Sequence, residues 1–153
     1  MPTYFCYTRR DALTPEQRSD LAARITHTHT EVTGAPHSFS QVAFRELESD
    51  SHFVGGRPAD KAMVWLYGHI RAGRPAEMKE RLMVDLRDHL MAVTGADERL
   101  VWVYVNELAP TDMIEFGHVL PAHGMEQEWF DALPSVLRAW LLTFGKPSPR
   151  FTL

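Results

Sequence analysis

A proline directly after the initiator methionine is the first residue of this sequence that could carry out chemistry. Met1 is normally removed when the next residue is as small as Pro2, and the chain would then begin with a secondary amine. Free α-amino groups titrate near about pH 7.7–8.0, so this nitrogen could act as an acid or a base close to neutrality. The alternative is a chain end without a function, since many proteins begin with Met-Pro.

Two arginines form a second candidate, an anion-binding pair. Arg71 and Arg74 lie in the segment Arg71-Ala72-Gly73-Arg74-Pro75, which links a predicted strand to a predicted helix. The start of a helix presents free backbone N–H groups and a positive dipole potential, and both favour an anion. Guanidinium groups can bind carboxylates through two parallel hydrogen bonds. The pair is therefore predicted to bind a carboxylate, with two solvent-exposed loop arginines as the alternative.

Glu115 and Tyr104 are two further candidates. Glu115 is an acid within the otherwise apolar run 113–117. If buried there, its carboxyl would have a raised pKa, which suits proton transfer, although the outward position of a β-hairpin would accommodate it equally well. Strand alternation over 101–105 places Tyr104 and Trp102 on one face and the valines on the other. Packing at a subunit interface is the alternative for Tyr104.

An internal repeat shows which elements must position these residues. Val32-Thr33-Gly34-Ala35 recurs as Val93-Thr94-Gly95-Ala96, and the offset of 61 also relates Arg10 to Arg71 and Val42 to Val103. Each copy is predicted to be strand, helix, strand. A unit with so long a helix closes by a right-handed crossover, which makes its two strands parallel.

Both helices have clear sequence signals. Thr14 can cap the first, Pro15 suits its first turn, and Gln17 stands where a capping-box partner belongs. Its apolar stripe ends at Gly34, a natural C-terminal stop. The second is predicted over Pro75–Thr94, with an apolar residue at every turn on one face and Gly95 after it.

The strands are predicted at Thr3–Tyr7, Phe39–Leu47, Ala62–Ile70 and Leu100–Leu108. We expect a mixed α/β (α+β) fold in one domain spanning 1–153. Its βαβ repeats cover about 2–47 and 62–108, and together they form a four-stranded sheet with both helices on one face. The tail, about 109–153, should be helical over 126–144, with Pro134 allowing a break, and loose over 145–153. The open face of the sheet must be buried by the tail or by other subunits, so we expect an oligomer.

The two copies differ at His29, which aligns with Leu90. His29 follows Ile25 by four residues and so lies on the apolar stripe of the first helix. The plainer interpretation is a core histidine bonded to a backbone carbonyl, and the alternative is a polar group at the rim of a pocket. His27 and His29 lack the i, i+4 spacing of a helical metal pair, and we expect no metal site, although His118 and His123 lie in one loop.

Composition excludes several other classes of protein. The 153 residues carry a net charge of −4 and contain no basic run, which argues against nucleic-acid binding. A single cysteine, Cys6, rules out an internal disulfide framework and a four-cysteine zinc site. No basic and apolar leader begins the chain, and no apolar run approaches the 18 or so residues of a membrane helix. We expect a soluble, cytoplasmic protein.

These features together resemble the tautomerase superfamily, and within it cis-3-chloroacrylic acid dehalogenase and its homologues. The amino-terminal proline, the duplicated βαβ unit and the arginine pair after the third strand are hallmarks of the superfamily. The resemblance covers nearly the whole sequence. The motifs that carry it are His29, Arg71-x-Gly73-Arg74, Val101-Trp102-Val103-Tyr104, Glu115-Phe116-Gly117, Leu120-Pro121 and Glu128-Trp129-Phe130.

The resemblance implies a homotrimer that needs no cofactor and no metal. It also implies a substrate-binding group, in which Arg71 and Arg74, with His29, hold the carboxylate of a small substrate and polarise its conjugated double bond. Loops at Ser49–Arg57 and Ala109–Met113 are expected to line the pocket and to influence which acid is accepted.

The catalytic roles implied by the resemblance fall to three residues. Glu115, assisted by Tyr104, would activate water for attack at carbon 3, and Pro2 as a cation would protonate carbon 2. The preferred function is therefore water addition to small unsaturated carboxylic acids, including hydrolytic dehalogenation of 3-haloacrylates, with keto–enol tautomerase activity. The alternatives are a 2-keto acid tautomerase of the phenylpyruvate type and a non-catalytic protein-interaction module.

Overall fold

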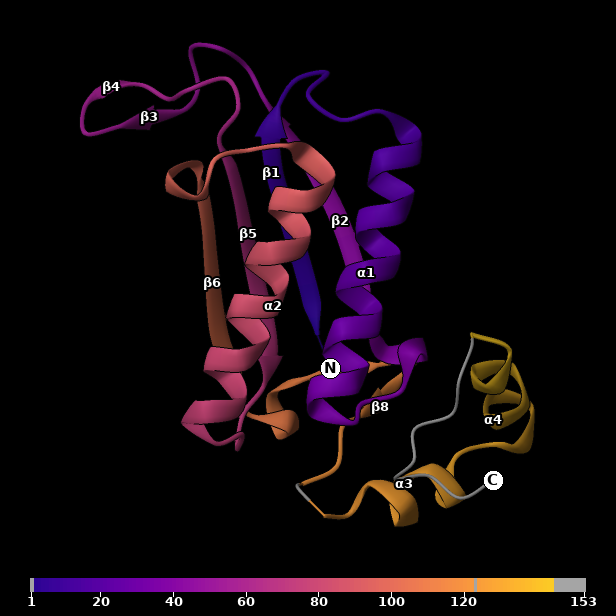
Figure 1. The fold of residues 1–153 in the computed structure, drawn as a ribbon. Coiled ribbons are helices and arrows are strands. Elements are labelled where there is room, and N and C mark those ends of the chain that lie inside the picture. Colours follow the sequence, from indigo (N-terminus) through magenta and orange to yellow (C-terminus); the bar gives the residue numbers. More distant parts are fainter. Residues whose placement is uncertain (1, 123, 145–153) are drawn as a thin grey trace.

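Two βαβ units share one four-stranded sheet in the computed structural model, which describes residues 2–122 and 124–144 (Figure 1). The first unit consists of β1 (Thr3–Arg9), α1 (Pro15–Thr33) and β2 (Gln41–Leu47), and the second of β5 (Val64–Arg71), α2 (Ala76–Thr94) and β6 (Val101–Leu108). The strand order is β2-β1-β5-β6. Strands within each unit are parallel, and the units meet through the antiparallel pair β1 and β5. The predicted fold class is confirmed.

Short elements connect and follow these units. They are the strands β3 (Phe53–Val54), β4 (Arg57–Pro58), β7 (Ile114–Glu115) and β8 (His118–Val119), the helices α3 (Glu126–Ala132) and α4 (Ser135–Leu141), and the 3₁₀ turns η1 (His37–Phe39), η2 (Glu98–Leu100), η3 (Pro110–Asp112) and η4 (Leu142–Phe144). The predicted tail helix is thus two helices separated at Pro134. The predicted loose end at 145–153 lies outside the described residues.

The ends of α1 match the sequence signals. The Thr14 hydroxyl accepts a hydrogen bond from the Gln17 N–H, and the Gln17 side chain accepts one from the Thr14 N–H, at 3.2 and 2.9 Å. Gly34 ends the helix in the left-handed region, with a φ of 71°. The strand boundaries were wrong by one or two residues: β2 begins at Gln41, β5 begins at Val64, and Leu100 belongs to the turn η2. Phe39 belongs to the turn η1 rather than to β2, and its ring packs against Phe116.

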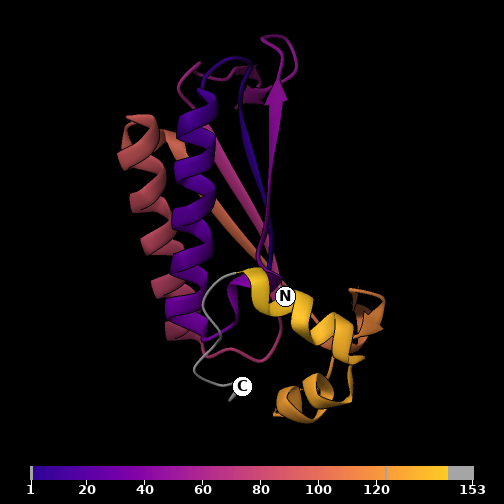
Figure 2. The ribbon, with the colours of Figure 1, turned by 90° about the vertical axis from the view of Figure 1, so that its right-hand side faces the viewer.

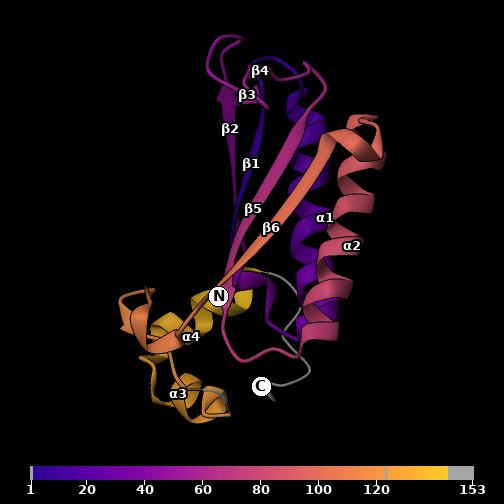
Figure 3. The ribbon, with the colours of Figure 1, turned by 90° about the vertical axis from the view of Figure 1, so that its left-hand side faces the viewer.

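Both long helices cover the same face of the sheet (Figures 2 and 3). The core between helices and sheet is fully buried. It contains Leu21 and Ile25 of α1, Leu82, Leu86 and Leu90 of α2, and Tyr4, Cys6, Leu66 and Ile70 of the two central strands. Each copy of the repeat therefore buries its helix against its own half of one sheet, as the apolar stripes predict.

The opposite face of the sheet is lined with aromatic side chains, and no helix of residues 2–122 or 124–144 lies across it. Tyr7 stacks on Trp65 with ring centroids 4.8 Å apart, and the edge of Tyr104 meets Trp65 at 5.8 Å. Trp102 and Tyr104 are 39% and 46% exposed. The helices α3 and α4 lie beyond one end of the sheet, so the described tail does not cover this face (Figures 1 and 2). Among the helices at 2–122 and 124–144, none combines the length and apolar character needed to span a bilayer.

Candidate functional site

The antiparallel pairing of β1 and β5 brings the start of the chain next to the arginine segment. Thr3, which follows Pro2, pairs with His69, two residues before Arg71. The C-terminal part of α1 and the β7–β8 hairpin lie at this same end of the sheet (Figure 1). Five of the six predicted site residues therefore come from segments that meet at one end: Pro2, His29, Arg71, Arg74 and Glu115.

Pro2 is buried at the start of β1. Its carbonyl accepts a hydrogen bond from the backbone N–H of Gln41 at 3.0 Å, which ties the chain end to the edge strand β2. A proline at the first position of a strand removes no ladder hydrogen bond that the sheet needs. The fold thus fixes the position of Pro2 through its carbonyl and leaves its nitrogen out of the ladder.

His29 is buried, but its partner is not the backbone carbonyl expected for an ordinary core histidine. Its Nδ1 lies 2.8 Å from the hydroxyl of Tyr4 on β1. Burial, reinforced by the positive charge of Arg74, holds the pKa of the His29 imidazole well below its usual range, so the ring is neutral at pH 7. His29 therefore lies within the electrostatic reach of Arg74.

Arg71 is a buried residue, 6% exposed, and not a solvated loop arginine. Its two terminal nitrogens donate to the Glu126 carboxylate at 2.7 Å and to the Pro121 carbonyl at 2.9 Å. Arg74 donates in turn to the carbonyl of Arg71. The tail helix α3 thus supplies a carboxylate to the very guanidinium that was predicted to bind a substrate carboxylate.

Glu126 was not among the predicted site residues. Burial raises the pKa of its carboxyl, but backbone N–H groups at the start of α3 and the charge and hydrogen bond of Arg71 outweigh burial and leave the pKa below its usual value. Glu126 and Arg71 are 55 residues apart. No local sequence pattern connects them. From the sequence alone, Glu128, two positions later, would have been an equally good candidate for the ion-pair partner of Arg71.

Glu115 faces inward from the β7–β8 hairpin. Its neighbour Ile114 points outward and is 70% exposed. Polarity alone would place the apolar isoleucine inside and the acidic glutamate outside. Burial raises the pKa of the Glu115 carboxyl above its ordinary value. Desolvation of a carboxylate opposes its ionisation, so this group would be a stronger base once ionised than a carboxylate in water.

A groove of about 930 Å³ lies beside Glu115 on the open face of the sheet. Its wall is built by η1, by the start of β2, by the hairpin, and by the ends of β1, β5 and β6; among the lining residues are Thr3, Phe5, Gln41, His69, Met113 and Glu115. Of the six predicted site residues, Glu115 alone lines this groove. The predicted pocket loop Ala109–Met113 contributes Asp112 and Met113. The other predicted loop, Ser49–Arg57, includes β3 and the first residue of β4 and lies at the opposite end of the sheet, so within one chain that expectation was wrong (Figure 1).

Tyr104 is the one predicted site residue that the fold places elsewhere. It lies within β6, paired with Tyr67, and its ring contacts Trp65 and Trp102 on the open face. Four residues of strand, about 13 Å, separate Tyr104 from Leu108, which lines the groove. A single chain therefore does not bring Tyr104 to Glu115.

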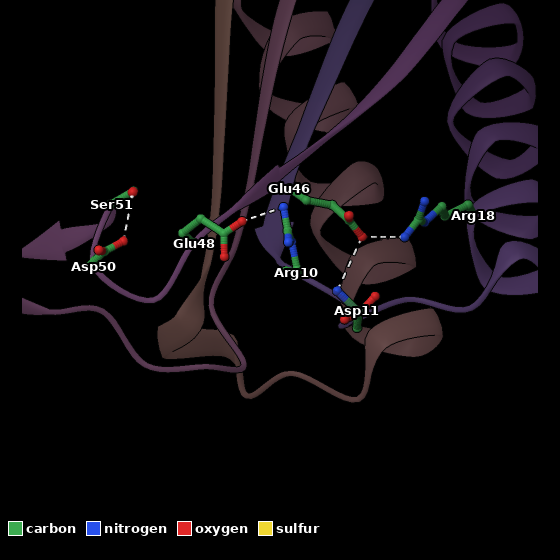
Figure 4. Close-up of polar contacts among 7 residues, drawn as sticks. All are labelled: Arg10, Asp11, Arg18, Glu46, Glu48, Asp50 and Ser51. Atoms are coloured by element: carbon green, nitrogen blue, oxygen red, sulfur yellow. Dashed lines mark hydrogen bonds and ion pairs between the residues drawn. The ribbon is translucent and has the colours of Figure 1, made fainter.

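The repeat provides an internal comparison for the arginine pair. Arg10, the counterpart of Arg71, lies at the opposite end of the sheet and forms an exposed ion pair with Glu48 (Figure 4). Next to it, the Glu46 carboxylate joins Arg18 of α1 to the backbone N–H of Asp11. Of these two arginines, Arg71 alone is buried and paired with a tail carboxylate in the described part of the chain, and it lies at the end of the sheet where Pro2 begins β1, called the proline end below.

Two fused βαβ units that share one sheet define the class: a protein of the tautomerase fold. The family model described as "Putative oxalocrotonate tautomerase enzyme" matches residues 1–132. A crystal structure of N1, a member of the cis-3-chloroacrylic acid dehalogenase family, has 34% identity and a TM-score of 0.89, covering 92% of this chain and 99% of that one. The chain therefore belongs to the tautomerase superfamily and is related to cis-3-chloroacrylic acid dehalogenase.

Two more distant structures agree on the fold. A symmetric trimer of fused 4-OT shows 23% identity and a TM-score of 0.72, covering 80% of this chain and 98% of that one. FG41 malonate semialdehyde decarboxylase inhibited by 3-bromopropiolate shows 21% identity and a TM-score of 0.65, covering 86% and 99%. No protein of curated function matches the sequence. Superfamily membership implies that the protein is an enzyme.

Proposed function

We propose that the protein adds water to small unsaturated carboxylic acids, including the hydrolytic dehalogenation of 3-haloacrylates. The observation that carries this proposal is the meeting of different chemical groups at one end of the sheet. A buried Pro2, a buried arginine and a neutral histidine lie at the same end of the sheet as a carboxyl of raised pKa (Figure 1). Such a set offers an acid, a base and an anion-binding group without any further component.

Binding of the substrate carboxylate falls to Arg74, Arg71 and His29. Arg71 uses one N–H toward Glu126 and one toward Pro121, and a guanidinium has five N–H donors in all. Its remaining donors and those of Arg74 supply the charge-assisted hydrogen bonds that a carboxylate needs. This polarises the conjugated double bond and makes carbon 3 electrophilic.

The reaction balances with one water molecule. Glu115 accepts a proton from water while the water oxygen bonds to carbon 3. The Pro2 ammonium gives a proton to carbon 2 of the former double bond. A halogen at carbon 3 then leaves as halide while the new hydroxyl loses its proton, which yields malonate semialdehyde. The raised pKa of Glu115 favours proton uptake at this step.

Tyr104 joins the site in this proposal through oligomerisation. The exposed aromatic face formed by Tyr7, Trp65, Trp102 and Tyr104 packs against neighbouring copies in a homotrimer, and a neighbour's Tyr104 reaches the groove. Support comes from the exposure of the two outermost rings and from the fused 4-OT symmetric trimer of the same fold. The same contact removes the open face from water.

A second candidate function is tautomerisation of 2-keto acids of the phenylpyruvate type. The positive charges of Arg71 and Arg74 at the proline end favour the neutral form of an amine, and a neutral Pro2 would be a base rather than an acid. Such a base could move a proton between the carbon and the oxygen of an enol. The family description, which names an oxalocrotonate tautomerase, also supports this candidate.

A substrate panel with matched variants tests both candidates. Chloride release from cis-3-chloroacrylate, hydration of an acetylenic acid and ketonisation of phenylenolpyruvate are measured for the wild type, Pro2→Ala and Pro58→Ala. Pro58 is an exposed proline of β4 at the other end of the sheet, so its variant should retain wild-type rates. We expect Pro2→Ala to lose most of the activity; retention of all activities in Pro2→Ala would contradict the mechanism. No turnover by the wild type of any compound would favour a binding module.

Arginine variants test substrate binding in the same way. Arg74→Ala should raise KM strongly with a smaller change in kcat, because a carboxylate contact is made in both the ground state and the transition state. Arg10→Ala, which alters only the exposed ion pair with Glu48, is the matched control and should leave KM unchanged. An unchanged KM in Arg74→Ala would remove that residue from the site.

A further inference from the structure

A buried contact between β1 and α1 involves Tyr4, a residue not yet given a role. Tyr4 is inaccessible to solvent, its hydroxyl lies 2.8 Å from Nδ1 of His29, and the two rings meet edge to face with centroids 5.8 Å apart. The other ring nitrogen of His29, Nε2, is also buried and has no hydrogen-bond partner among the described residues. The imidazole is thus held on one side and unsatisfied on the other.

The hydrogen-bond inventory decides which atom carries the proton. If the Tyr4 hydroxyl donates to Nδ1, the neutral ring carries its proton on Nε2, and only this one N–H lacks a partner. If Nδ1–H donated to Tyr4 instead, both the hydroxyl hydrogen and the Nε2 lone pair would be unsatisfied. Because a buried polar group without a partner is costly, the first arrangement is favoured. Burial and the charge of Arg74 oppose the doubly protonated ring by lowering its pKa.

The sequence makes room for this tyrosine at a position that otherwise has no reason to be glycine. Gly68 in the central strand β5 pairs with Tyr4, and a Cβ atom there would lie 2.5 and 2.7 Å from Cε1 and Cδ1 of the Tyr4 ring. The φ angle of Gly68 is not positive, so backbone conformation does not demand glycine. Glycine within a strand weakens it, and here the ring of Tyr4 explains the choice.

We propose that Tyr4 is a positioning residue that fixes His29 as the neutral tautomer protonated on Nε2, so that this N–H donates a hydrogen bond to an oxygen of the bound carboxylic acid. The hydrogen bond from His29 Nε2–H to the substrate rests on the proposed function. The role of Tyr4 in selecting the tautomer does not, because it follows from the Tyr4–His29 contact alone. Substrate binding would satisfy the buried donor that the free protein leaves without a partner.

Nitrogen NMR of the full-length protein tests the tautomer directly. With ¹⁵N-labelled histidine, the His29 signals are assigned by their loss in His29→Gln. The wild type should show an unprotonated Nδ1 and a protonated Nε2 at pH 7. In Tyr4→Phe the Nδ1 signal should shift toward a mixture of tautomers. Tyr7→Phe removes a hydroxyl from the same strand on its other face, where the ring stacks on Trp65, and should leave His29 unchanged.

A double-mutant cycle tests the connection to catalysis. Tyr4→Phe should raise KM about tenfold with little change in kcat, the effect of weakening one neutral hydrogen bond made in both ground and transition states. In the His29→Gln background, where the side-chain amide can donate without help, adding Tyr4→Phe should change KM less than twofold. Equal effects of Tyr4→Phe in both backgrounds, or a wild-type His29 protonated on Nδ1, would overturn the proposal. If the wild type turns over none of the substrates, the proposed function is wrong. The NMR result would then still decide whether Tyr4 selects the tautomer of His29.

Discussion

Replacing Gly68 by alanine tests how tightly the proline end of the sheet is packed. The added Cβ would lie 2.5 Å from Cε1 of Tyr4, about 1 Å closer than the normal contact of carbon atoms at roughly 3.5–4.0 Å. The Tyr4 ring cannot move freely, because it is completely buried between the sheet and the two helices. The ring must therefore shift by about 1 Å or β1 must separate from β5.

The expected cost follows from two opposing effects. Overpacking a core costs about 1–3 kcal/mol, and replacing a strand glycine by alanine recovers roughly 0.5–1 kcal/mol of backbone entropy. Because the added Cβ would meet two ring carbons at 2.5 and 2.7 Å, the overpacking cost lies in the upper part of its range, and Gly68→Ala should lower the free energy of unfolding by about 1–2 kcal/mol. For a domain of this size, that corresponds to a fall in Tm of roughly 2–8 °C.

Urea and thermal unfolding of wild type and Gly68→Ala measure this effect, with Gly95→Ala as the control. Gly95 ends α2 in the left-handed region, with a φ of 71° and open space around its Cα, so alanine there is strained but touches no site residue. Both variants should be destabilised, but only Gly68→Ala should raise KM, because it displaces Tyr4 and with it His29. Wild-type stability in Gly68→Ala would refute the packing of Tyr4 described above.

Two further predictions concern carboxyl groups. Glu126→Gln should lose about 1–3 kcal/mol of stability at pH 7, because Arg71 is then a buried cation without its carboxylate. The folded-state pKa of Glu126 is lowered, so the stability that its carboxylate contributes is complete above the unfolded pKa and disappears as the pH falls through the folded value. Unfolding measured at pH 7 and pH 3 should therefore show a smaller difference in free energy of unfolding between wild type and Glu126→Gln at the lower pH. A difference that stays constant would contradict the ion-pair assignment. For Glu115, whose pKa is raised, the acidic limb of the kcat/KM profile should lie at higher pH than for an ordinary carboxyl, and Glu115→Gln should lose that limb with most of the activity. Persistence of the limb in Glu115→Gln would assign it to another group.

Local signals in the sequence predicted the elements well. The capping box of Thr14 and Gln17 and the glycines at 34 and 95 act within a few residues of the helix ends that they define. The repeat predicted two βαβ units and both helices on one face. It did not predict that β1 and β5 would be antiparallel neighbours, because a repeat fixes the content of each unit and not the way in which two units join.

The candidate site depended on contacts that the sequence does not encode locally. The ion pair of Arg71 with Glu126 joins residues 55 positions apart, and its partner helix follows a hairpin whose path no periodicity reveals. Tyr4 could have been found, since strand alternation puts it on the same face as Pro2 and Cys6. Tyr104 was predicted on the correct face of its strand, but its separation from Glu115 follows from where β6 and the hairpin lie in three dimensions.

The proposed mechanism depends on proton transfer at the Pro2 nitrogen, and converting that nitrogen into an amide removes this chemistry. Two full-length proteins are compared after their N-termini are verified by intact mass: one that begins at Pro2, and one extended by two residues so that the Pro2 nitrogen is an amide. Turnover of cis-3-chloroacrylate and phenylenolpyruvate is measured for both, with matching circular dichroism as the test of folding. The form that begins at Pro2 should be active and the extended form inactive, because an amide nitrogen has no proton to give or accept near neutral pH. Equal activity of the two forms would exclude the Pro2 nitrogen as the group that gives or accepts the proton.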